Sequence, residues 1–158
     1  MQSWHWESRK YDKWATEAIT RLLKEVDVAS ATNRARIIEV ASCKAEASVN
    51  IRKGKKITVF ELSFKCTWEG SVIAGPESET CGGEVEVVDA MQDDVGEEFN
   101  VRISLLKATS NAVGVPCKEL MRTVGAAAVR SVVQSFAKEF VAHDAALEDL
   151  ANAHVRLP

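Results

Sequence analysis

The sequence has few of the residues from which reactive or cross-linked sites are built. Its 158 residues include three histidines, four cysteines, three prolines and one tyrosine. The cysteines are widely separated and form no C-x-x-C pair, the spacing by which one turn presents two ligands to a zinc ion. Cys43 and Cys66 fall within apolar strand patterns, so we expect buried, reduced thiols, which favours an intracellular compartment.

Long hydrophobic runs are also missing. No apolar stretch approaches the roughly 20 residues that a bilayer-spanning helix requires. The first seven residues lack the apolar core of a signal peptide. We therefore expect a cytoplasmic protein without a membrane partner. The hydrophobic fraction of 46% and the charged fraction of 27% are ordinary for a globular chain, and the length suits one domain, 1–158.

Positive charge is absent from the middle of the chain. Residues 66–101 contain no Lys or Arg and 10 acidic side chains, a net charge of −10. Residues 1–65 carry 13 basic and 8 acidic side chains (+5), and residues 102–158 carry 7 and 5 (+2). Such segregation favours a charged protein partner, whereas the acidic segment disfavours nucleic acid.

Hydrophobic periodicity predicts two helices. An amphipathic helix is expected at about 12–26, where Trp14 and Leu22 belong to an apolar stripe with four-residue spacing. A long helix is expected at about 116–143, with Pro116 in its first turn.

Between the helices, alternation with a period of two predicts four strands. The alternating segments are residues 37–49, 56–69, 83–89 and 98–105. Alternation of this kind is typical of an antiparallel sheet with one wet face and one face covered by helices. The expected fold class is α+β: a four-stranded antiparallel meander sheet, at about 36–106, flanked by an N-terminal helix and a long C-terminal helix.

The usual catalytic constellations are not found. A nucleophilic site needs a base and an orienting group, yet His5, His143 and His154 lie near the ends of the chain, where solvated or capping roles are expected. The acidic run at 93–98 lacks the spacing of a calcium loop, so a solvated turn is expected there. We predict no enzyme activity, no metal site and no cofactor.

A basic loop is the more informative feature. Arg52, Lys53, Lys55 and Lys56 place four cations in five residues at a predicted hairpin end, with Gly54 supplying backbone freedom. One interpretation is a solvated turn whose lysines protect a sheet edge. The other is a rigid anchor for an acidic patch on a partner.

Two tryptophans precede the first helix. Trp4 and Trp6 flank His5, and they are costly to leave in water. They either pack onto the sheet or the first helix, or form a mobile aromatic arm that engages a partner.

Together these features give a family resemblance. The segments Ser3–Arg9 and Glu46–Lys55, with Trp14 between them, resemble the N-terminal domain of the activator of heat shock protein 90 ATPase. Phe64, the Trp68-Glu69-Gly70 run and the segment Gly83–Val87 resemble it as well, so the likeness extends from residue 3 to about 142.

The resemblance implies a co-chaperone that binds the middle domain of heat shock protein 90 and favours its closed, ATP-hydrolysing state. It implies that Arg52, Lys53 and Lys55 carry binding, with Lys56 as electrostatic support, and that Trp4, His5 and Trp6 form an N-terminal motif. In the family an Asn-rich stretch, linked to nucleotide turnover by the chaperone, precedes that motif, whereas only Met1-Gln2-Ser3 precedes Trp4 in the given sequence. The family's second domain lies outside the 158 residues, so weaker stimulation than that of a two-domain activator is expected. Two alternatives remain: a small-ligand carrier and a single-strand nucleic-acid-binding module.

Overall fold

The computed structural model describes residues 7–73, 75 and 79–156. Its strands are β1 (Glu7–Lys10), β2 (Asp27–Ala29), β3 (Asn33–Arg52), β4 (Lys55–Val72), β5 (Thr80–Met91) and β6 (Arg102–Ala108). Its helices are α1 (Asp12–Lys24), the 3₁₀ turn η1 (Gln92–Asp94), α2 (Asn111–Leu120), the π turn η2 (Met121–Gly125) and α3 (Ala126–Arg156).

All the strand pairs are antiparallel and join one sheet in the order β1-β3-β4-β5-β6, with β2 pairing β3 as well. The predicted α+β class, antiparallel sheet and long C-terminal helix are confirmed. The predicted number of four strands is wrong, because the described residues already form a sheet of six. The added strands, β1 and β2, have four and three residues. Strands this short show no usable alternation, and their pairing with β3 is what makes them extended.

The helical region after β6 is longer than expected and is interrupted. It begins at Asn111 and not at Pro116, which lies inside α2, and α3 continues to Arg156. Pro116 has no N–H to donate to the helix, so its position was expected to mark a first turn. The π turn that follows, Met121–Gly125, redirects the chain into α3. No helix among residues 7–73, 75 and 79–156 combines the length and apolar character needed to cross a bilayer.

The core lies between the sheet and the helices α1 and α3. Its largest fully buried side chains are Trp68, Phe136, Phe140, Ile19, Leu23 and Leu62. The Trp68 indole N–H donates to the Ser104 carbonyl at 3.2 Å, beneath Gly83. A Cβ atom on Gly83 would lie 1.8 Å from that carbonyl oxygen, so only glycine fits there.

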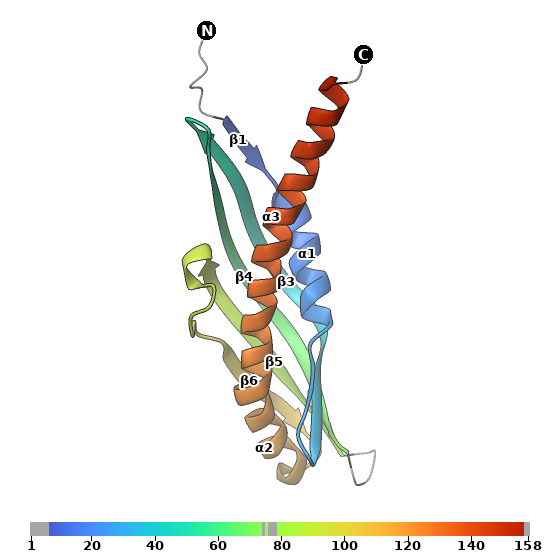
Figure 1. Cartoon of the computed structure of the whole chain (residues 1–158). Coiled ribbons are helices and arrows are strands. Elements are labelled where there is room, and N and C mark those ends of the chain that lie inside the picture. Colours follow the sequence, from blue (N-terminus) through green and yellow to red (C-terminus); the bar gives the residue numbers. More distant parts are fainter. Residues whose placement is uncertain (1–6, 74, 76–78, 157–158) are drawn as a thin grey trace.

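The molecule is long and narrow (Figure 1). The hairpin between β3 and β4 runs along most of its length, because these strands have 20 and 18 residues. Strand β5 stops at Met91, opposite Glu61, so the last part of the hairpin continues beyond it. The hairpin tip, β1 and the last turns of α3 therefore share one end of the molecule, and α2 lies at the other (Figure 1).

Candidate functional site

The basic loop forms the tip of the β3–β4 hairpin. Arg52 pairs with Lys55, which leaves a loop of two residues. Lys53 and Gly54 have φ values of +53° and +79°, the two positive angles that a type I′ turn requires. This turn matches the right-handed twist of the strands, so the predicted hairpin is a tight and well-directed one.

Strand geometry divides the three cations that lie on the strands between two faces. Successive side chains of β4 point to opposite faces, and the buried residue Phe60 packs against Phe136 of α3. Lys56 has the same parity as Phe60 and points to the helix face. Lys55, together with its paired residue Arg52, falls on the open face.

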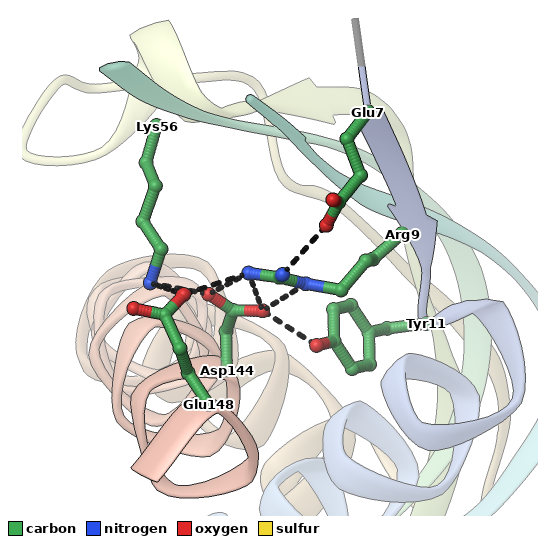
Figure 2. A network of polar contacts seen from close by, with 6 residues as sticks. All are labelled: Glu7, Arg9, Tyr11, Lys56, Asp144 and Glu148. Atoms are coloured by element: carbon green, nitrogen blue, oxygen red, sulfur yellow. Dashed lines mark hydrogen bonds and ion pairs between the residues drawn. The ribbon is translucent and has the colours of Figure 1, made fainter. Parts of the chain in front are cut away.

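Lys56 is neutralised within the molecule. Its ammonium lies 2.8 Å from Asp144 Oδ2 and 2.9 Å from Glu148 Oε2, both on α3 (Figure 2). Within residues 7–73, 75 and 79–156, by contrast, Lys53 and Lys55 make no ion pair. The loop thus presents Lys53 and Lys55 to solvent, while Lys56 ties it to the body.

The carboxylate of Asp144 is the centre of a larger network (Figure 2). Although its side chain is only 3% exposed, it accepts hydrogen bonds from Arg9 Nε at 3.1 Å, from Arg9 Nη2 at 3.1 Å and from the Tyr11 hydroxyl at 2.5 Å. Arg9 also donates to Glu148 and to Glu7, each at 3.0 Å. Strand β1, the start of α1, strand β4 and helix α3 meet in this network.

The network lowers the pKa of Asp144 and raises the pKa values of Lys56 and Tyr11. Burial alone raises the pKa of Asp144, but the hydrogen bonds from Lys56 and Tyr11 outweigh it and hold that pKa below its usual value. The hydrogen bonds to Asp144 and Glu148 raise the pKa of Lys56. Burial and the hydrogen bond to Asp144 raise the pKa of Tyr11. Asp144 is therefore anionic and Lys56 cationic at neutral pH.

Sequence reasoning missed this network. Arg9, Tyr11, Asp144 and Glu148 were not expected to act together, because Arg9 and Asp144 are 135 residues apart in the chain. The spacing of Asp144 and Glu148, one helical turn apart, is a weak signal that they share a face. Trp4, His5 and Trp6 lie outside the described residues. The strand that follows them pairs Glu7 with Ile51, next to the hairpin tip.

Groups with reactive potential are few in the described part of the chain. Residues 7–73, 75 and 79–156 contain no cluster of three or more His, Cys, Asp or Glu side chains that could hold a metal ion. Burial is the main cause that raises the pKa of Cys66 and of Cys81 to about 12, which keeps both thiols protonated. His143 stacks on Trp14 with ring centroids 4.5 Å apart, where a solvated or capping role was expected.

The space between the sheet and the helices is filled by side chains. Trp14 packs on Phe136 and Phe140, with centroid distances of 5.7 Å and 5.8 Å, and Phe60 meets Phe136 at 5.2 Å. One hollow of about 360 Å³ borders the sheet near Arg34, Arg36, Glu69 and Thr80, and its charged lining does not suit an apolar ligand. A larger hollow of about 530 Å³ lies along α3, where Val141 is exposed, so it is a feature of the surface and does not enclose a ligand.

Comparisons with known proteins agree on one family. Residues 8–144 match the family described as "Activator of Hsp90 ATPase, N-terminal". The human activator of 90 kDa heat shock protein ATPase homolog 1 is 31% identical over 107 residues, which cover 68% of this chain and 31% of the relative. The Saccharomyces cerevisiae Hsp90 co-chaperone AHA1 is 29% identical over 143 residues, 89% of this chain and 40% of the relative.

Solved structures agree with the sequence relatives. The human Aha1 N-terminal domain in solution has a TM-score of 0.63 and 26% identity, and the match covers 84% of this chain and 94% of that one. A crystal structure of Aha-1 from Plasmodium falciparum has a TM-score of 0.74 over 96% of both chains; at 21% identity it shows the fold alone. The chain spans less than half the length of the two sequence relatives named above.

Proposed function

Because this chain belongs to the family of activators of Hsp90 ATPase, we propose that it is a co-chaperone that binds the middle domain of heat shock protein 90 and stimulates its ATPase. The observation that carries the proposal is the division of the basic loop. Lys53 and Lys55 are exposed at a tight turn, whereas Lys56 is tied to α3. A rigid pair of cations at the tip of the long β3–β4 hairpin suits an acidic surface of a partner.

Activation acts on the conformational equilibrium of the chaperone, and the hydrolytic residues belong to the chaperone. A bound module raises turnover when it binds the closed, hydrolysis-competent state more tightly than the open state. Arg52, Lys53 and Lys55 are the contacts that we assign to this preference. We place the activity in the cytosol, in keeping with four free cysteines, three of them buried.

A chaperone ATPase assay with two matched variants tests the proposal. Lys53→Glu/Lys55→Glu reverses two loop lysines that form no ion pair with any residue the structure describes, and we expect at least a tenfold loss of affinity, of the order that misplaced interfacial charges cause. The control, Lys107→Glu/Lys118→Glu, makes the same charge change at exposed positions of β6 and α2 and should keep full stimulation. Equal stimulation by both variants would refute the role of the loop. No stimulation by the wild-type chain would refute the proposed function.

The two alternatives have their own tests. A small-ligand carrier requires an apolar cavity, and the aromatic side chains between the sheet and α3 leave little room for one. A single-strand nucleic-acid binder would use the basic loop together with Trp4 and Trp6. Titration of a labelled oligonucleotide distinguishes it: binding that is weak at low salt and lost near physiological salt removes this alternative.

A further inference from the structure

One carboxylate of α3 holds two segments that meet at the hairpin tip. Asp144 receives Arg9 from β1 and Lys56 from β4, and its side chain is 3% exposed. Glu148, one turn further along the same face, receives the same two cations at 3.0 Å and 2.9 Å. Figure 2 shows the Arg9 guanidinium and the Lys56 ammonium reaching these two acids from different strands.

Both anchored strands lie directly beside the turn. Ile51 pairs with Lys56 on one side and with Glu7 on the other, so these positions form one row across β4, β3 and β1. Only one residue on each hairpin strand separates this row from the Lys53-Gly54 turn. The contact of Lys56 with α3 therefore acts at the base of the loop, and the contact of Arg9, which pairs with Val49, acts two residues further along the strands.

This part of the hairpin needs such an anchor. Strand β5 ends opposite Glu61, so within the described part of the chain residues 55–60 of β4 have β3 on one side and no strand on the other. Instead, the amide of Phe60 donates to the Gln92 side chain at 3.0 Å. A two-stranded hairpin is marginally stable in water unless further strands or a helix pack on it. Here β1 pairs with β3, and α3 supports the ribbon through the contact of Phe136 with Phe60 and, nearer the tip, through Lys56 and Arg9.

We infer that Asp144 and Glu148 are positioning residues for the basic loop, which fix the direction in which Lys53 and Lys55 point by holding Lys56 and Arg9. Lys56 belongs to this anchor and not to the surface that meets the partner. The inference rests on the proposed function for its effect on ATPase stimulation. Its structural part, that the anchor orders the tip, holds for the chain alone.

The test uses a variant that keeps the net charge. Lys56→Gln/Glu148→Gln removes one positive and one negative charge and leaves Arg9 and Tyr11 on Asp144. The control is Arg122→Gln/Glu119→Gln, which removes an exposed ion pair of 2.6 Å at α2 and the π turn. Amide hydrogen exchange of the chain alone measures how well ordered the hairpin tip is. Titration of the chain in a chaperone ATPase assay measures the effect of that order on stimulation.

We expect faster exchange at residues 51–57 in the Lys56/Glu148 variant and unchanged exchange in the part of the hairpin that pairs with β5. The concentration for half-maximal stimulation should rise by about three- to tenfold, because the partner must now order the loop. The salt dependence of binding should be kept, since Lys53 and Lys55 remain. The control variant should match the wild type in both measurements.

Several results would overturn the inference. Unchanged exchange at the tip would show that the anchor does not order the loop. Faster exchange with unaltered stimulation would show that the order has no role in activation. Faster exchange throughout the sheet, with a lower melting temperature, would indicate general destabilisation. A wild-type chain that fails to stimulate the chaperone refutes the proposed function, and the exchange data then decide the structural part by themselves.

Discussion

Lys53 holds a backbone conformation that asparagine and glycine adopt more readily than lysine. Its φ of +53° lies in the left-handed region, which costs an L-residue roughly 1–2 kcal/mol. Asn-Gly is the preferred sequence for such a turn. A lysine at this position is therefore explained better by what its charge does than by stability.

Replacement of Lys53 by asparagine should separate stability from function. We expect Lys53→Asn to raise the free energy of unfolding by up to about 1 kcal/mol, because asparagine is better suited to the left-handed conformation. The same variant should stimulate the chaperone less than the wild type. Urea unfolding and the ATPase assay measure the two effects. A variant that loses both stability and stimulation would contradict this account of the turn.

Gly83 occupies a position between two strands that only glycine fits. Strands β5 and β6 approach closely here, and a side chain on Gly83 would collide with the Ser104 backbone. We expect Gly83→Ala to lower the free energy of unfolding by about 2 kcal/mol or more, because the backbone of β6 must move and the Trp68 hydrogen bond is disturbed. Chemical denaturation measures the loss, and Gly54→Asn in the turn is a mild control. A neutral Gly83→Ala would show that β6 shifts easily.

The contacts of Asp144 with Lys56 and Arg9 should make the stability of the chain depend on pH in the acidic range. The pKa of Asp144 is lowered in the folded chain, so its contribution is complete above the unfolded value of about 3.9 and is lost as the pH falls through the lower folded value. The melting temperature should therefore decrease as the pH is lowered below about 4. Asp144→Asn should destabilise the chain at pH 7, by about 1–3 kcal/mol, and should flatten this acid dependence. An acid profile identical to that of the wild type would contradict the assignment.

How much of these elements the sequence reveals depends on the range of the interactions. Period-two alternation identifies β4, and the parity of Phe60 already places Lys56 on the helix face. Alternation fails in β3: a strict period of two over residues 37–49 would place Ala41 on the same face as the buried Ile37 and Ala45. Ala41 is exposed, because register shifts near Ile38 and Ala41 turn the strand. The contacts of Asp144 depend on how α3 crosses the sheet, and no local pattern contains that information.

The charge of the whole molecule gives a prediction about association. The chain has a net charge of −3, so uniform charge would repel an acidic partner, and added salt would speed binding. If the basic tip steers the encounter, added salt should instead slow it. We expect the association rate with the chaperone to fall as salt rises from about 0.05 to 0.3 M, measured by stopped flow. The Lys53→Glu/Lys55→Glu variant should lose or reverse this trend, and a wild-type rate that rises with salt would exclude steering by the tip.

The pairing of Glu7 with Ile51 also has a practical consequence for experiments on the chain. The chain enters the sheet beside the loop, and α3 runs on past Glu148 for eight more residues, roughly 12 Å, at the same end. A fluorophore or affinity tag attached at Glu7 or near Ala151 would therefore lie at the same end of the molecule as Lys53 and Lys55 and would hinder a partner from reaching them. The end of β4 and the start of β5 lie at the opposite end of the molecule (Figure 1), so a label attached near Val72 or Thr80 would report binding without obstructing it.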